Sequence, residues 1–500
     1  MNPGRKNAKR IAFEKAVLTE TRALWMHVDF RRFVNGLIFG VLFAAGVIAL
    51  NFHHSPPALP GDLKKVLGTS LLITAICTIY SLYLVTFEAG RVKTFRSIAS
   101  IGLLSILPIA SAIWFPDLRI SLYFIPVTMI AFIFGIVYSE RTAIMLSLLL
   151  SLLAGLSLEL TNPHVKVSPY DLTMILFGGA AVAALGCGRI RKRSKLLKLG
   201  VFSSMVQVLL ILAANLRAGE RLASQDVLLG FANGMLWAVL ITAILPLVEQ
   251  VFRVATGISL LELSDQNHPL LRRLSLEAPG TYHHSLILGN LSESAGEAIG
   301  ANSLLIRVGA YFHDIGKLMK PEYFIENEGM QGSMHANLSP TMSALVITAH
   351  TKDGVELARE KSLPEPIIDL IQQHHGTSLV EYFFHQAQEE DEGSRVDEEL
   401  FRHPGPKPQT KEAGVLLLAD SVESASRALP EPTPSRIARQ VHDVINRKLM
   451  DGQLDECELT LTDVHKIEQN LIRSLTSVFH GRIKYPEADE PAAGREQNGR

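Results

Sequence analysis

"AIMLSLLLSLLAGLSLEL", residues 143–160, decides the class of the fold. Apolar residues occupy every side of a helix built from this stretch, so no polar face remains for water. As a helix it is about long enough to cross a hydrocarbon core of roughly 30 Å. A soluble core helix is the alternative, and the neighbouring sequence argues against it.

Seven similar apolar runs accompany this one in the first half of the chain, separated by short polar breaks. The eight runs are 33–51, 66–87, 97–115, 120–138, 142–160, 172–188, 200–216 and 226–248. A soluble core does not accommodate so many helices without a polar face. We therefore predict an all-α fold that begins with a bundle of about eight transmembrane helices over residues 33–250.

The charges between the runs predict the orientation. If the N-terminal segment 1–32 is cytoplasmic, the segments on that side hold 18 Lys and Arg residues, against 6 on the other side. Lys and Arg accumulate on the cytoplasmic side of membrane proteins. We therefore expect a multi-pass protein of the cell membrane whose second half is also cytoplasmic. The runs contain almost no ionisable residues at mid-membrane depth, which favours an anchor or sensor over a transporter.

The second half of the chain is different in character. Residues 255–486 alternate amphipathic helical stretches with loops, and residues 487–500 are typical of a disordered tail. The formal net charge of the chain is -1, so there is no electrostatic case for binding a nucleic-acid polymer. The three cysteines, Cys77, Cys187 and Cys457, are too far apart to form a CxxC site or a disulfide framework.

Histidines and aspartates recur in this half at the ends of apolar helical stretches. One short segment, "YFHDIGK" at 311–317, contains His313 and Asp314 side by side. The others are His284, His350, His374, His375 and Asp420. A single histidine in such a place is usually a satisfied core residue, but so many desolvated polar groups need a common partner. Imidazoles with a few carboxylates and no thiolate suit Fe, Mn or Zn.

The order H…HD…H…HH…D resembles that of the HD-domain metallophosphohydrolases. Longer strings, such as "PGTYHHSLILGNL", "FHDIGKLMKPEYFIEN" and "QQHHGTSLVEYFF", resemble the membrane-bound seven-transmembrane HD phosphodiesterases. The resemblance implies an all-helical HD domain over 255–486 that holds two divalent ions, Mn or Fe. It also implies hydrolysis of cyclic di-AMP to linear pApA in second-messenger signalling. The expected partners are a cyclic dinucleotide and the lipid bilayer, and a homodimer remains open.

The resemblance further implies a set of metal ligands. One ion would be held by His284, His313, Asp314 and Asp420, and the other by Asp314, His350, His374 and His375. Asp314 would then bridge the two ions. Two ions about 3.5–4 Å apart can activate water and stabilise the leaving oxygen of a phosphodiester. His284 is preferred to His283 because it matches the family position.

Two cations near these ligands are candidates for binding substrate phosphate. Lys317 lies four residues after His313, which predicts that both project from one helix face, so Lys317 could neutralise phosphate charge. Lys317 and the bridging Asp314 are our candidate catalytic residues. Arg427 follows Asp420 by seven residues, but it can equally pair with Glu423 at i,i+4. Six other histidines of this half are assigned no ligand role: His335, and His385, His403, His442, His465 and His480 as surface or packing residues.

Two other functions are weighed against this one. The first is an HD hydrolase of cyclic di-GMP or guanosine polyphosphate. The cyclic di-GMP branch has a Gly-Tyr-Pro turn after its two histidines, and "HHGTSLVEYFF" has none. The second is a membrane receptor that binds a nucleotide without hydrolysing it, which the complete ligand set disfavours. The chain departs from the family where only "FHHSPPALPGDLKK" replaces a large extracytoplasmic domain after the first span.

Overall fold

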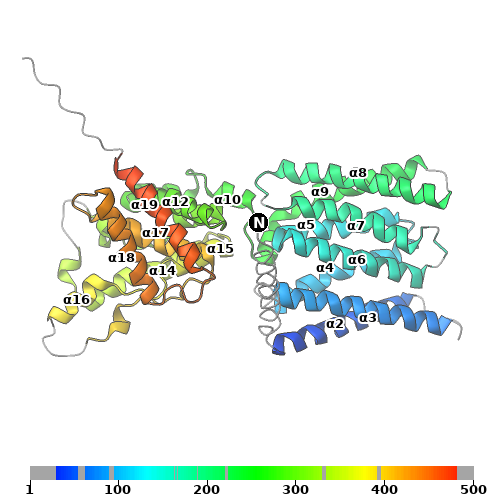
Figure 1. Cartoon of the computed structure of the whole chain (residues 1–500), viewed down its shortest axis with the longest axis horizontal. Coiled ribbons are helices and arrows are strands. Elements are labelled where there is room, and N and C mark those ends of the chain that lie inside the picture. Colours follow the sequence, from blue (N-terminus) through cyan, green and yellow to red (C-terminus); the bar gives the residue numbers. More distant parts are fainter. Residues whose placement is uncertain are drawn as a thin grey trace, which may run out of the picture. The chain divides into compact units, whose positions relative to one another are not determined.

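The computed structural model describes residues 30–480 apart from 55–61, 89–94, 163, 166, 189, 220–222, 329–333 and 391–395. The predicted tail 487–500 and nearly all of segment 1–32 lie outside the described residues. The described residues are helical, with one isolated β-bridge between Leu379 and Arg402 and no strand, which confirms the all-α prediction. They form two compact units, one up to Ile258 and one from Ser259 (Figure 1).

Every apolar run corresponds to a helix in the first unit. These helices are α2 (Phe30–His54), α3 (Asp62–Phe87), α4 (Phe95–Trp114), α5 (Val127–Val137), α6 (Glu140–Thr161), α7 (Pro169–Gly186), α8 (Arg193–Ala218) and α9 (Ser224–Phe252). Six of them, all except α4 and α5, are long and apolar enough to cross a membrane within the described residues. Two shorter apolar segments, Ile98–Trp114 and Leu122–Val137, complete the set. The protein is therefore a multi-pass membrane protein.

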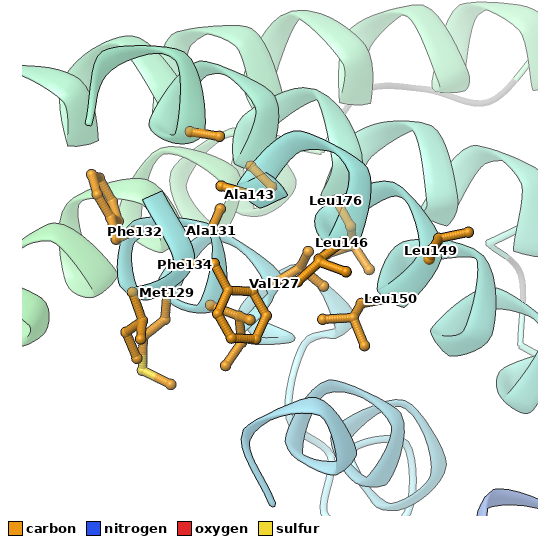
Figure 2. Close-up of a cluster of buried hydrophobic side chains, with 14 of the residues drawn as sticks. Val127, Met129, Ala131, Phe132, Phe134, Ala143, Leu146, Leu149, Leu150 and Leu176 are labelled. Atoms are coloured by element: carbon orange, nitrogen blue, oxygen red, sulfur yellow. The ribbon is translucent and has the colours of Figure 1, made fainter. Parts of the chain in front are cut away.

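The run 120–138 is not the single long helix that its composition predicts. A short 3₁₀ turn, η1 (Leu122–Phe124), precedes Pro126, and α5 begins only after this proline. Proline lacks the N–H that an interior helical position donates, so it starts a helix rather than continuing one. All residues of α5 except Ile136 are buried. Figure 2 shows this core, in which side chains of α5 pack with those of α6 and α7.

The segment that contains α5 nevertheless crosses the bundle. Asn162 Nδ2 donates to the carbonyl of Ile113 at 3.1 Å, so α4 and α6 end at the same side. Thr142 Oγ1 donates to Glu88 at 2.6 Å, so α3 ends where α6 begins. Because the 22 residues of α6 extend about 33 Å, these two sides lie far apart. The chain between α4 and α6 must return from one side to the other.

The other helices alternate in direction in the same way. Gly188, just after α7, donates its N–H to Glu140 at the start of α6 (3.0 Å), while Arg217 near the end of α8 pairs with Asp171 near the start of α7. Ser81 near the end of α3 donates to the carbonyl of Gly36 near the start of α2. The helices α8 and α9 are antiparallel as well, with close approaches between positions 200 and 238 and between 211 and 230. The start of α2 and the end of α9 therefore lie at the same side of the unit.

The second unit is built from shorter helices joined by 3₁₀ turns. After α10 (Gly257–Leu263) its helices are α11 (Pro269–Glu277), α12 (Pro279–Ala298), α13 (Ser303–Phe312), α14 (Pro340–Glu360), α15 (Glu365–Gln373), α16 (Glu381–Glu390), α17 (Lys411–Arg427), α18 (Pro434–Met450) and α19 (Leu461–His480). The 3₁₀ turns are η2 (Ile315–Met319), η3 (Pro321–Tyr323), η4 (Ile325–Asn327), η5 (Met334–Asn337) and η6 (Glu398–Phe401). Helix starts are capped by side chains, for example Asn302 before α13 and Ser339 before α14.

Helix α17 is the centre of this unit. Its residues 413–420 are all buried, because "AGVLLLA" has no polar position and other helices surround it. It contacts α12, α13, α15, α18 and α19. The first polar groups on this helix after the apolar stretch, beginning with Asp420, therefore emerge inside the unit and not at its surface.

Candidate metal centre

The structure brings all seven predicted ligands together. They come from α12 (His284), the end of α13 (His313 and Asp314), α14 (His350), the end of α15 (His374 and His375) and α17 (Asp420). Their donor atoms form two groups: Asp314 with His350, His374 and His375, and His284 with His313 and Asp420. Within each group the atoms lie within 4.8 Å of one another, which is the spacing of ligands around one ion.

The carboxylate of Asp314 lies between the two groups. Its Oδ2 atom is 3.1 Å from Nε2 of His313 and 3.9 Å from Nε2 of His284. Its Oδ1 atom is 3.3 Å from Nε2 of His350 and 3.6 Å from Nε2 of His374. One oxygen thus faces each group, as a bridging carboxylate requires.

Asp420 reaches both groups as well. Its Oδ1 atom is 3.1 Å from Nε2 of His284 and 3.9 Å from Nε2 of His313. Its Oδ2 atom is 3.6 Å from Nδ1 of His375. The side chain of His375 is 25% exposed, whereas those of the other six residues are at most 7% exposed. The centre is therefore closed on most sides and open beside His375.

Backbone carbonyls fix the orientation of three imidazoles. Each ring donates from Nδ1 to the carbonyl three residues earlier: His313 to Ala310 at 2.8 Å, His350 to Ile347 at 2.5 Å and His374 to Ile371 at 2.7 Å. A carbonyl only accepts, so the proton of each neutral ring is on Nδ1 and the lone pair of Nε2 points into the centre. This arrangement is typical of histidines that bind a metal.

The polar atoms at the centre fit a cation. Nε2 of His313 and Oδ1 of Asp314 are buried and have no hydrogen-bond partner among the described residues. Nε2 of His350 lies 3.2 Å from Nε2 of His374, although both atoms are acceptors in these tautomers. Such unpaired buried groups are costly, and a positive ion that binds all the lone pairs removes the cost. The nitrogen and oxygen donors suit a divalent metal ion.

Burial and neighbouring groups together set the protonation of these side chains. Burial lowers the pKa of His374 to about 4 and holds the pKa of His375 well below its usual value. Burial alone would raise the pKa of Asp314, but the adjacent imidazole of His313 and the ammonium of Lys317 hold that pKa well below its usual value. At neutral pH the two imidazoles are therefore neutral and the carboxyl is ionised, which are the states that bind metal.

His284 behaves differently. Burial acts to lower its pKa, but hydrogen bonds to Asp420 and Glu423 outweigh burial and raise the pKa to about 10. The ring donates from Nδ1 to Glu423 at 2.7 Å and from Nε2 to Asp420 at 3.1 Å. Without metal, His284 is therefore an imidazolium at pH 7, and a metal ion must replace its Nε2 proton.

Lys317 does not share a helix face with His313, so that prediction is wrong. Helix α13 ends at Phe312 and η2 begins at Ile315, where the glycine at 316 packs directly on α14. A Cβ atom at Gly316 would overlap the carbonyl oxygen of His350. The Nζ atom of Lys317 lies between two carboxylates, 2.8 Å from Asp314 and 2.6 Å from Glu326.

Arg427 makes the alternative contact that the sequence allowed. Its Nε atom donates to Glu423 at 2.6 Å, one helical turn earlier on α17. Glu423 is buried and accepts the Nδ1 proton of His284, a role that we did not predict. Its position three residues after Asp420, on the same face of a buried helix, was the available signal.

A cleft opens beside the exposed edge of the centre. This cavity of about 520 Å³ is lined by His375, Asp420, His403 and Lys448, among others. His403 is a packing residue and not a surface residue, since it is buried and the centroid of its ring lies 4.3 Å from that of the His375 ring. Lys448 was not singled out in the sequence, because an amphipathic helix with several basic residues gave no reason to choose it.

The position of Asp314 between the groups generates a prediction about metal content. We expect the purified full-length protein to bind two divalent ions and the Asp314→Ala variant to bind one or none, because both groups lose a ligand. Metal analysis of the purified proteins measures this directly. Asp443→Ala, which removes an exposed carboxylate from α18, is the matched control and keeps both ions. Two ions in Asp314→Ala would contradict the bridging role.

The raised pKa of His284 generates a prediction about protons. At pH 7, metal binding should release about one proton from His284, whose pKa lies above this pH, and none from His374, whose pKa lies below it. Calorimetry in buffers of different ionisation enthalpy measures the release. In Glu423→Gln the release should be smaller, while Glu431→Gln, at an exposed position, should match the wild type. A heat of binding that does not depend on the buffer would refute this account.

Comparison with known proteins agrees with this architecture. Residues 32–256 match the family described as a 7TM receptor with intracellular HD hydrolase, and residues 281–425 match the HD domain. The chain is 40% identical over 370 residues to the cyclic-di-AMP phosphodiesterase PgpH of Bacillus subtilis, which covers 73% of this chain and 52% of that protein. It is 34% identical over 434 residues to PgpH of Listeria monocytogenes, which covers 85% of this chain and 59% of that protein.

A crystal structure of the L. monocytogenes PgpH HD domain in complex with cyclic di-AMP is 45% identical to the matching part, with a TM-score of 0.41. The match covers 44% of this chain and 100% of that chain. The chain spans a little over half the length of the two full-length relatives, and only residues 55–61 separate α2 from α3. The two family matches, in this order, show that the chain belongs to the family of membrane proteins that join seven-transmembrane receptor-type helices to an HD hydrolase domain.

Proposed function

We propose that this protein is a membrane-bound, metal-dependent phosphodiesterase that hydrolyses cyclic di-AMP to linear pApA. The observation that carries the proposal is the carboxylate of Asp314, which presents one oxygen to each of two groups of metal-ligand side chains. Two metal ions held in this way are suited to phosphodiester hydrolysis. The two full-length relatives are named cyclic-di-AMP phosphodiesterases, which supports the same substrate here.

We assign the ligands as the two groups suggest. One ion is held by His284, His313, Asp314 and Asp420, and the other by Asp314, His350, His374 and His375. Mn or Fe fits this mixture of imidazole and carboxylate donors. When bound, the ions activate water and polarise the phosphoryl oxygen. The role of the protein is to hold these side chains in the right protonation states within a site that is mostly closed to water.

Lys317 and Arg427 act on ligands in this proposal and do not touch the phosphate. The ammonium of Lys317 is held between Asp314 and Glu326, so it keeps the bridging carboxylate ionised and oriented. Glu326 is itself held by the hydroxyl of Thr281 at 3.0 Å. Arg427 orients Glu423, which in turn orients His284.

We further propose that the HD domain is cytoplasmic. The start of α2 and the end of α9 lie at one side of the helical bundle, as an even number of crossings requires. The loop between α7 and α8 lies at that same side, and residues 189–199 contain six Lys and Arg residues. A concentration of basic residues on one side supports a cytoplasmic location for that side.

The orientation predicts where fused reporters are active. A reporter fused after Arg253 should read as cytoplasmic, and one fused near Pro60 should read as external, because the two positions lie on opposite sides of the proposed bilayer. Paired alkaline phosphatase and fluorescent protein fusions measure this. The reverse pattern would reject the orientation without touching the metal centre.

The substrate assignment predicts the outcome of a competition assay. The metal-loaded full-length protein should convert cyclic di-AMP to linear pApA with a higher kcat/KM than it shows for cyclic di-GMP, as followed by chromatography of the products. Asp314→Ala should be inactive, and Asp443→Ala should retain activity. Preferred cleavage of cyclic di-GMP, or binding of cyclic di-AMP without turnover by protein that holds two ions, would show that the assignment is wrong.

A further inference from the structure

Three cationic residues line the cleft beside the metal centre: Arg402, Arg447 and Lys448. Two of them are already neutralised by carboxylates that line the same cleft. Arg402 pairs with Asp451 at 2.9 Å, and Arg447 pairs with Glu381 at 3.0 Å. Lys448 differs from them and is the residue of interest.

The ammonium of Lys448 has a neutral partner. Its Nζ atom donates to the hydroxyl of Ser378 at 2.8 Å, and no carboxylate lies within ion-pair distance among the described residues. The side chain is partly buried in the wall between α18 and the segment after α15. Asp420, Asp451 and Glu381 attract this ammonium from around the cleft, but none of them forms an ion pair with it. No salt bridge therefore offsets the cost of its partial burial, so this arrangement is poorly explained as a support for the fold. It is suited to an anionic ligand that enters the cleft.

Lys448 and the metal centre share this one cavity. His375 and Asp420 form the wall next to the metal centre, and Ser378 lies three residues after His375. Ser421 and Ser424, which follow Asp420 on α17, line the same space. A ligand that places one phosphate at the centre can therefore extend along the cleft toward Lys448.

A cyclic dinucleotide contains two phosphodiesters, and the centre can hold only one of them. We infer that Lys448, with Ser378, binds the second phosphodiester, the one that is not being hydrolysed. This inference rests on the proposed function, because it takes a two-phosphate substrate as given. Lys448 is then a positioning residue, since it holds the ring of the substrate while a distant bond is broken.

The inference separates substrates by the number of their phosphates. In Lys448→Met, the KM for cyclic di-AMP should rise about 10- to 100-fold, the size of one charge-assisted hydrogen bond, with kcat changed less than about threefold. Bis(p-nitrophenyl) phosphate has a single phosphodiester, so its kcat/KM should not change. Lys448→Arg should restore most of the affinity for cyclic di-AMP. All measurements use the metal-loaded full-length protein in detergent.

A matched control and a stability measurement exclude simpler effects. Arg436→Gln removes one positive charge from the other end of α18, where Arg436 is exposed and pairs with Glu431, and it should behave as the wild type. The melting temperature of Lys448→Met should be unchanged or higher, because the ammonium has no ion pair to lose. An equal loss of activity toward both substrates, with a lower melting temperature, would instead show a structural role and overturn the inference.

Binding of the product gives a readout that needs no turnover. The dissociation constant of linear pApA, measured by calorimetry, should rise in Lys448→Met by a factor similar to that of the KM. If the wild type binds pApA but does not cleave cyclic di-AMP, the proposed function fails while this comparison still decides the role of Lys448. Equal affinity in the wild type and in Lys448→Met, or no binding of pApA to either protein, would overturn the inference.

Discussion

The second unit depends on one buried carboxylate with a histidine cluster on each side. The two oxygens of Asp314 face different imidazoles, and the lone pairs of these rings converge on the same small volume. Such an arrangement needs positive charge nearby, so the ammonium of Lys317 belongs to the structure as much as to the chemistry. The close packing of Gly316 on α14 holds the carboxylate at this point.

The site and the core are built from the same helices. Helix α17 is buried because its first half is apolar on all sides, and this burial removes Asp420 and Glu423 from water. The ends of α13 and α15 meet the same place, so histidines that follow apolar stretches become internal groups. Backbone carbonyls at these helix ends then accept the Nδ1 protons. Packing and ligand orientation therefore have one origin.

The sequence was sufficient where composition alone decides the structure. Each apolar run became a helix, and five histidines and two aspartates stood out because they lie at the ends of apolar helical stretches. The resemblance to the HD family then selected the ligand set and separated His284 from His283. The sequence was insufficient where the result depends on partners distant in the chain. The shortness of α5, the 3₁₀ turn that separates Lys317 from α13, and the placement of Glu423, His403 and Lys448 all depend on which helices pack together.

The imidazolium of His284 has a consequence for the protein before it acquires any ion. Its two protons join Asp420 to Glu423, so the empty centre contains an internal counter-charge for its carboxylates. Small zinc modules lack such a substitute and unfold without their metal. We therefore expect folding and metal loading to be separable steps here, in which the chain assembles its helices first and later exchanges the Nε2 proton of His284 for an ion.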